Sequence, residues 1–442
     1  MASEWRAASL SALAELSGGF AFKSGDYAAS GRFVLRTLNI SDDCSINRDD
    51  AVYLPEELCP QYSRFELRAQ DTLFVMVGAT LGKVGFVREK DLPALLNQNM
   101  WLIRAKPQTA NPRFVHYAFR HAVKESLGWA SGSARDFVRR DDYRNLKMPA
   151  PPVPEQRAIA HILGTLDDKI ELNRRMNETM EAMARALFKS WFVDFDPVRA
   201  KAEGRDPGLP KPLADLFPDS FEDSELGEIP KGWQVTSLGA LIHTVKGRSY
   251  KSEELVDSDT ALVTLKSFAR GGGYRPDGLK PFAGTYKPEQ VVKPGELVIA
   301  CTDVTQAAEV IGRPAVVRGT AGYRTLVASL DTLIVRPRHP SMTRAFLYFL
   351  GGTEAFVAHT YAHTSGTTVL HLAKEAVPSF KFGLPPAQLV ETFDSVASRT
   401  LNRIQAMEEE SATLSALRDT LLPKLISGQL RVNHAYCIKE AM

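Results

Sequence analysis

Apolar residues recur every three or four positions through two long stretches of the chain, a spacing that predicts two long amphipathic helices. The first stretch runs from Glu155 to Phe192 and contains no proline and one glycine. Its seam positions, two of them asparagine, are Ile159, Leu163, Leu166, Ile170, Asn173, Asn177, Met180, Ala184, Leu187 and Trp191. The register returns 234 residues later at Phe393, Ala397, Thr400, Ile404, Met407, Ser411, Leu414 and Leu421, with Arg418 as a break.

A seam of this length is typical of coiled-coil packing, in which apolar residues of two helices interlock. Each helix would be about 55 Å long at 1.5 Å per residue. We expect the two helices to pair with each other as an antiparallel coiled coil. The alternative is that each helix packs only on its own domain.

The rest of the chain repeats itself with a shift of about 230 residues, which divides it into two similar halves. Trp5–Leu13 (WRAASLSAL) resembles Trp233–Leu241 (WQVTSLGAL), and Ser131-Gly132-Ser133 resembles Ser365-Gly366-Thr367. Each half begins with short β-branched or aromatic runs bounded by Gly and Pro, which predict strands. These runs include Thr72–Val77, Leu297–Ala300, Ala315–Val317 and Thr332–Val335, and helical stretches lie at 112–125 and 341–351. The predicted fold class is α+β.

Five regions follow from this pattern. They are an α+β domain over residues 1–152, a long helix over 153–196, a connector over 197–231, a second α+β domain over 232–386 and a second long helix over 387–432. The connector holds six prolines, and from Glu203 to Glu228 it has eight acidic residues against two basic ones. This composition predicts an extended, solvated segment.

Composition narrows the class of protein without identifying it. The 442 residues carry a net charge of +2, which excludes a histone-like polycation. The four cysteines form no CxxC pair, so neither a disulfide scaffold nor a zinc site is indicated. The chain has no apolar run long enough for a membrane helix and no apolar core for a signal peptide near its start. We expect a reduced, cytoplasmic, soluble protein.

Catalytic and cofactor motifs are missing from the sequence. Gly78–Val84 resembles a nucleotide-binding loop, but three residues separate its glycines and valine replaces the required hydroxyl. Asp194 and Asp196 fit a solvated helix end, and the spacing of His116 and His121 does not place two metal ligands on one helix face. Neither a nucleophile elbow nor a methyl-donor loop is found. We therefore expect a binding and scaffolding protein with no catalytic residue, metal or cofactor of its own.

Basic residues cluster in both halves, and this favours a nucleic-acid partner over a merely solvated surface. Six arginines and one acidic residue lie between Ile311 and Gly351. The predicted phosphate contacts are Arg135, Arg139, Arg140, Arg313 and Arg324. The predicted base-reading residues are Lys23, Thr80, Lys83 and Gln98 in the first domain and Lys251, Arg275, Asp303 and Gln306 in the second.

Several strings resemble the specificity (S) subunit of type I restriction–modification systems. They are DTLFVMVGATLGKVGFV (71–87), LDDKIELN (166–173), ALFKSWFVDFDPV (186–198) and LLPKLISGQLRV (421–432), within the same two-repeat layout. One departure is that the second repeat has Thr302–Gln306 where the first has Gly78–Gly82, so the two loops need not be alike.

The resemblance implies two target-recognition domains, each of which reads half of a split DNA target while the helices set the spacing. It also implies partners: modification subunits that bind S-adenosylmethionine and methylate adenine, and restriction subunits that use ATP and Mg²⁺. The chain itself would hold no cofactor and catalyse no reaction. The competing interpretation is a coiled-coil adaptor that bridges protein partners without reading DNA; a free-standing methyltransferase or nuclease is disfavoured by the missing motifs.

Overall fold

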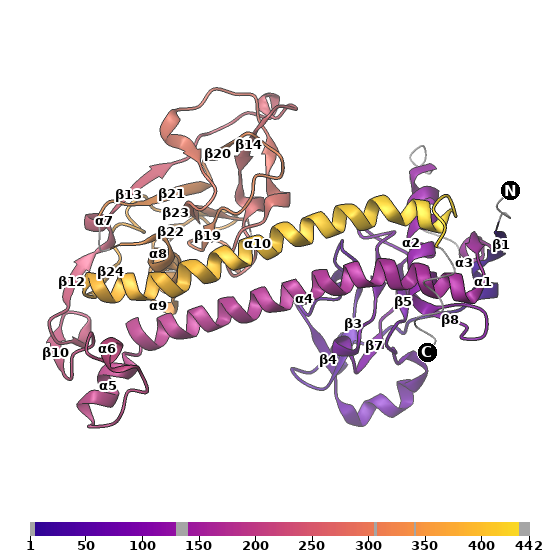
Figure 1. Cartoon of the computed structure of the whole chain (residues 1–442), viewed down its shortest axis with the longest axis horizontal. Helices are drawn as coiled ribbons and strands as arrows, with labels where there is room; N and C mark the ends of the chain where they lie inside the picture. The colour runs from indigo at the N-terminus through magenta and orange to yellow at the C-terminus, as the bar shows by residue number, and fades with distance from the viewer. Residues whose placement is uncertain (1–4, 130–139, 305–306, 340–341, 433–442) are drawn as a thin grey trace. The chain divides into compact units, whose positions relative to one another are not determined.

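The computed structural model describes residues 5–129, 140–304, 307–339 and 342–432 (Figure 1). The chain divides into two compact units. Unit 1 comprises residues 1–171 and 411–442, and unit 2 comprises residues 172–410. Each unit therefore contains one α+β domain and one part of each long helix.

Unit 1 is built on two small sheets. The first is antiparallel, in the order β2 (Ala14–Gly18), β8 (Met100–Ala105), β5 (Thr72–Val75) and β6 (Val84–Phe86). The second has the order β4 (Val52–Leu54), β3 (Arg32–Leu35) and β7 (Ala94–Leu96), with β3 and β7 parallel. A further pair joins β1 (Arg6–Ser9) to β9 (Lys147–Ala150). The helices of this domain are α1 (Leu10–Leu13), α2 (Pro112–Trp129) and α3 (Arg140–Arg144).

Unit 2 repeats this topology. Its first sheet has the order β13 (Ile242–Lys246), β21 (Thr332–Pro337), β17 (Leu297–Ala300) and β19 (Pro314–Val316). Its second has the order β15 (Lys280–Pro281), β14 (Thr260–Val263), β20 (Thr325–Ala328) and β16 (Val291–Val292), with β14 and β20 parallel. The pair β12 (Gln234–Ser237) and β24 (Lys381–Leu384) matches β1 and β9. The helices are α7 (Leu238–Leu241), α8 (Arg344–Gly351) and α9 (Glu354–Ala362). The repeat inferred from the sequence is thus a repeat of the fold.

One element of unit 2 stands apart from this common plan. A three-stranded sheet has the order β18 (Thr302–Asp303), β23 (Leu370–Leu372) and β22 (Thr364–Ser365). In the sequence repeat its ribbon β22–β23 corresponds to the segment that begins at Ser131. Residues 130–139 lie outside the described part of the chain, so the comparison ends there.

The two long helices are α4 (Val153–Phe192) and α10 (Ala387–Ile426), each of 40 residues. Within unit 2, Phe188 and Trp191 contact Phe393, with ring centroids 5.3 and 6.2 Å apart, and Asn173 Nδ2 donates to Glu410 at 2.8 Å. Within unit 1, Arg418 pairs with Asp167 at 2.7 Å. In both units the later part of one helix therefore faces the earlier part of the other, and the predicted antiparallel pairing is confirmed. The second helix ends at Ile426, earlier than residue 432, just before Gly428 with φ of +75°.

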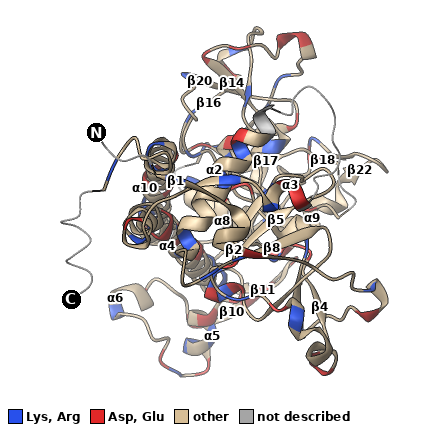
Figure 2. Ribbon diagram, turned by 90° about the vertical axis from the view of Figure 1, so that its right-hand side faces the viewer, with Lys and Arg blue, Asp and Glu red and all other residues tan. Residues whose placement is uncertain are grey.

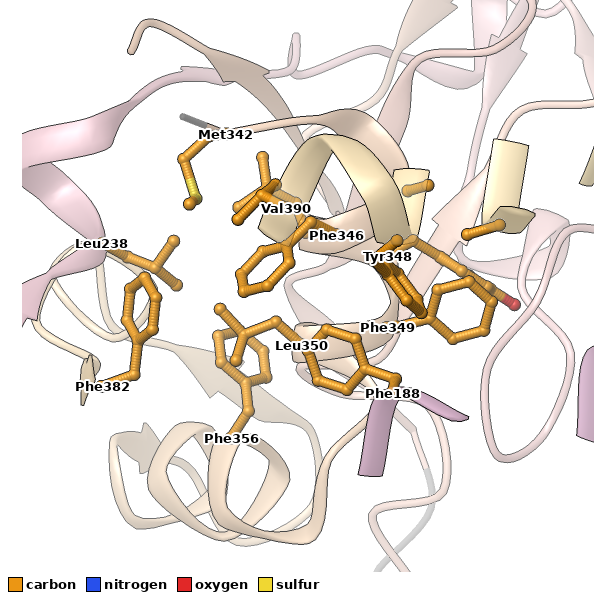
Figure 3. Packing of buried hydrophobic residues seen from close by; sticks show 14 of the residues in the cluster. Phe188, Leu238, Met342, Phe346, Tyr348, Phe349, Leu350, Phe356, Phe382 and Val390 are labelled. Carbon is orange, nitrogen blue, oxygen red and sulfur yellow. The ribbon is translucent and has the colours of Figure 1, made fainter. Parts of the chain in front are cut away.

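Aromatic side chains fill the core of unit 2 where α4 meets α8. Phe188 of α4 lies against Phe346 and Phe349 of α8, with ring centroids 5.1 and 6.1 Å apart (Figure 3). Phe356 of α9 and Phe382 of β24 join the same cluster. The apolar face of α4 thus serves as one wall of the domain core as well as half of the helix pair.

The connector is folded, so the interpretation of an extended, solvated segment is wrong. It contains α5 (Asp196–Ala202), α6 (Lys211–Ala214) and a hairpin of β10 (Phe221–Ser224) and β11 (Gly227–Pro230). Val198, Phe217 and Ile229 are buried with Trp233 in the core of unit 2. Two of the prolines stand in the first turns of α5 and α6, where a missing N–H costs nothing. The acidic residues face solvent, and a few spaced apolar side chains hold the segment down.

Candidate nucleic-acid interface

A buried tyrosine fixes each α+β domain to a long helix. In unit 1, Tyr117 Oη of α2 donates to Asp167 Oδ2 at 2.5 Å, and Arg418 binds the other oxygen of that carboxylate. In unit 2, Tyr348 donates to Glu181, which also pairs with Arg185 at 2.7 Å. Burial, followed by the neighbouring carboxylate, raises the pKa of both tyrosines, so both phenols stay protonated as donors. Within each unit, the α+β domain is therefore fixed to its segment of the long helix.

The loop from Gly78 to Lys83 in unit 1 is a turn between two strands. Gly78 and Gly82 have φ of +89° and +91°, and Gly82 N donates to Val75 O at 3.0 Å. A nucleotide-binding loop instead leads from a strand into a helix, whose N-terminal amides hold the phosphates. The loop therefore presents side chains, with Thr80 and Lys83 half-buried at its edge.

Three cations converge beside this loop. Lys83 lines a groove of about 360 Å³ together with Arg120 and Lys124, which lie one turn apart on α2. Lys83 also pairs with the exposed Asp42 at 2.7 Å. Asp42 is the one acidic residue of the described lining, and the remaining lining residues are Ser41, Cys44, Leu81, Gly82, Val84 and Val123. We call this cluster of Lys83, Arg120 and Lys124 the basic groove; its excess of positive charge suits an anion such as a DNA phosphate.

Arg120 and Lys124 were missed by sequence analysis. In the sequence they are only two basic residues four positions apart on an amphipathic helix. This spacing is also typical of an ordinary solvent-exposed helix face. The other first-domain candidates do not line the basic groove. Lys23 is exposed before a short 3₁₀ turn, and Gln98 is exposed after β7, where its backbone N donates to Phe20 O at 2.8 Å.

The second-domain candidates are spread over several loops. Lys251, Arg275 and Arg324 are exposed, and Arg275 pairs with Asp277 at 2.5 Å. Asp303 is instead buried, and its Oδ2 accepts the backbone N–H of Val310 at 2.8 Å, so this carboxylate braces its own loop. Arg135, Arg139 and Gln306 lie outside the described residues, and Arg140 is described only as the first residue of α3.

The acid-poor stretch from Ile311 to Gly351 does not form a free basic face. Arg318 pairs with Glu408 of α10 at 3.0 Å, and Arg336 pairs with Glu296 at 2.7 Å. Lys and Arg are interspersed with Asp and Glu along the chain (Figure 2). Acidic residues distant in sequence therefore neutralise part of the predicted cluster.

Arg313 is one member of that cluster with no ion pair among the described residues. It is half-buried, and its Nε is buried with no hydrogen-bond partner among the residues that the structure describes. Burial lowers the pKa of Arg313, and the nearby Arg185 lowers it further. A bound anion would relieve both costs, so Arg313 remains the best phosphate candidate in unit 2.

The described residues contain no arrangement of three or more His, Cys, Asp or Glu side chains that could hold a metal ion. His116 is buried against Phe86, and burial lowers its pKa to about 3, so it is a neutral core histidine. Asp194 pairs with Lys189, and Asp196 begins α5. Among the described helices, none has the length and apolar character needed to cross a membrane.

The sequence and the fold of this chain are similar to those of known proteins. Residues 2–182 match the family model described as the type I restriction modification DNA specificity domain. The HindI specificity subunit of Haemophilus influenzae is 23% identical over 66% of this chain and 70% of its own length. The MjaIX specificity subunit of Methanocaldococcus jannaschii is 25% identical over 79% of this chain and 76% of its own. A crystal structure of a type I restriction–modification S subunit from M. genitalium has the same fold, with a TM-score of 0.54, 14% identity and 96% coverage of both chains.

Proposed function

We propose that this chain, which belongs to the type I restriction–modification specificity family, binds double-stranded DNA and reads a two-part target, one half with each unit. The observation that carries the proposal is the repeated strand order of the two α+β domains. Two copies of one reading fold suit two half-targets, and each mismatched base pair in either half would cost about 1–3 kcal/mol.

Phosphate contacts would come from the basic groove in unit 1 and from Arg313 and Arg324 in unit 2. Among the described residues, Lys124, Arg313 and Arg324 have no acidic partner within ion-pair distance. Lys83 and Arg120 pair with exposed carboxylates, Asp42 at 2.7 Å and Asp419 at 3.8 Å. Such contacts position the protein on the duplex, while base edges in the grooves give sequence specificity.

The long helices would set the gap between the two half-targets. A helix of 40 residues spans about 60 Å, which exceeds one turn of DNA at about 34–36 Å. Large apolar side chains remain exposed on these helices at Leu172, Met176, Met183, Val396 and Leu417. We assign these positions to docking of the modification subunits, which would bring S-adenosylmethionine; restriction subunits would bring ATP and Mg²⁺.

The test is to express the chain with its modification subunits and to map methylated adenines in the host genome. The expected result is one motif with two defined halves and a fixed gap. Replacing residues 297–317 with the segment of another family member should change only one half. A motif that changes in both halves would contradict the proposal that each unit reads one half. If the chain is instead an adaptor that does not read DNA, no motif and no salt-dependent DNA binding should be found.

A further inference from the structure

The ribbon β22–β23 of unit 2 is a partly exposed strand pair without acidic residues. Residues 361–374 (YAHTSGTTVLHLAK) contain one lysine, two histidines, four Ser or Thr and no Asp or Glu. The turn depends on Gly366, whose φ is +106° and where an added Cβ would lie 2.1 Å from Val369 O. Such a ribbon can approach a polyanion without repulsion between carboxylates and phosphates.

The ribbon is anchored firmly to the body of unit 2. Leu372 N donates to Cys301 O at 2.9 Å, and β23 pairs with β18. Thr302 Oγ1 donates to Asp331 Oδ1 at 2.9 Å. The buried carboxylate of Asp303 accepts the backbone N–H groups of Val310 and Ile311, at 2.8 and 3.3 Å. A rigid support of this kind is what side chains that discriminate between bases require.

Two valines project from this platform into solvent. Val304 is 67% exposed and Val369 is 36% exposed. The antiparallel register of β18 and β23 pairs Asp303 with Leu370, so the next positions outward along this strand pair are Val304 and Val369. A pair of exposed β-branched side chains amid hydroxyl groups is an apolar contact point on an otherwise polar surface.

We propose that the outer end of the strand pair β18–β23 enters the major groove of the half-target read by unit 2, where Val304 and Val369 contact thymine methyl groups. The inference rests on the proposed function and deepens it. The major groove, about 12 Å wide, admits a two-stranded ribbon. The C5-methyl of thymine is the apolar group that base pairs present there, and the minor groove has none. Val304 and Val369 are therefore specificity-determining residues, whereas Asp303 is a positioning residue next to Val304.

The test removes the thymine methyl groups from the DNA and replaces the two valines in the protein, each change alone and both together. Thymines of the unit 2 half-target, defined by methylation mapping, are replaced with deoxyuridine, and affinity is measured for the full chain in complex with its modification subunits. Wild type should lose about fourfold in affinity for each contacted methyl. The double variant Val304→Ser, Val369→Ser should bind the natural target more weakly by a similar total factor and should be indifferent to deoxyuridine. Val256→Ser, an exposed valine elsewhere in unit 2, should behave as wild type.

Two results would overturn the proposal while leaving the proposed function intact. One is an equal deoxyuridine penalty in wild type and in the double variant, and the other is a unit 2 half-target that contains no thymine. Deoxyuridine in the other half-target serves as the internal control, because its effect must be the same in both proteins. Failure of the proposed function looks different: wild type itself would then show no preference for the mapped target.

Discussion

Neutralising the basic groove should lower the salt dependence of DNA binding by a predictable amount. The perturbation is the triple variant Lys83→Gln, Arg120→Gln, Lys124→Gln, which removes three positive charges from one groove of unit 1. Each lost phosphate contact flattens the slope of log K against log salt by about 0.9, so three contacts correspond to about 2.7. Between 0.05 and 0.20 M salt, wild type should therefore lose about 40-fold more affinity than the variant.

The three residues are not expected to contribute equally. Lys83 pairs with Asp42 at 2.7 Å, so a phosphate must compete with that carboxylate for Lys83. Lys124 is exposed on α2, and its single replacement should give close to the full slope change of one contact. We expect Lys83→Gln to give the smallest change of the three single variants.

The assay is fluorescence anisotropy on the specific target and on unrelated DNA, because a phosphate contact acts on both. A matched control, Lys211→Gln, Lys231→Gln, Lys287→Gln, removes the same charge from exposed positions in unit 2. It should leave the slope near that of wild type. A groove variant with an unchanged slope, or a control with the same decrease, would refute the assignment of these cations to phosphates.

Three further predictions concern stability and spacing. The pKa of His116 is about 3 in the folded chain, below its ordinary value of 6.5. As the pH falls below 6.5, His116 therefore takes up a proton in the unfolded chain before it does so in the folded one. The free energy of unfolding is highest above pH 6.5 and decreases below it. The free energy of unfolding of unit 1, measured by hydrogen exchange in α2, should decrease by about 2 kcal/mol between pH 7 and pH 5. His116→Gln should remove this pH dependence, and the control His243→Gln should not. Arg418→Ala leaves the half-buried Asp167 carboxylate and the buried Tyr117 without the Arg418 cation, and the free energy of unfolding in urea should fall by about 3–5 kcal/mol. Arg205→Ala, at an exposed pair, should lower it by under about 1 kcal/mol. The third change inserts seven residues after Asn173 and seven after Met407, which preserves the heptad pattern and lengthens both helices by about 10 Å. The mapped target should keep both half-sequences, and the gap between them should grow by about three base pairs. An unchanged gap would contradict the proposal that the helices set the spacing.

The long helices were predictable because their signal is local and repeated many times. The first was predicted within residues 153–196, with its apolar seam starting after Glu155, and the observed helix is Val153–Phe192. The connector was mispredicted because composition averages over residues, whereas folding there depends on a few of them. Phe217 and Ile229 stand among acidic neighbours and nevertheless reach the core beside Trp233.

The site was harder to predict because its electrostatics depend on residues far apart in sequence. Arg318 and Glu408 are 90 positions apart, so counting acids near Arg318 overstated the free positive charge. The basic groove joins Lys83 to α2 through a packing register that no local pattern encodes. Asp303 has the acceptor oxygens of a base-reading residue, but its own loop supplies backbone donors that satisfy them.

The division of the chain into units also bears on how it is made at the ribosome. Unit 2 is one continuous stretch, but the core of unit 1 includes Leu422, Leu425 and Ile426. The 239 residues from Leu172 to Glu410 must be synthesised before those side chains exist. At about 5–20 residues per second, the nascent first domain waits roughly 10–50 s with part of its apolar face uncovered. During synthesis the N-terminal domain is therefore the last to be completed, and a chain truncated before Leu422 would carry a finished unit 2 beside an unfinished unit 1.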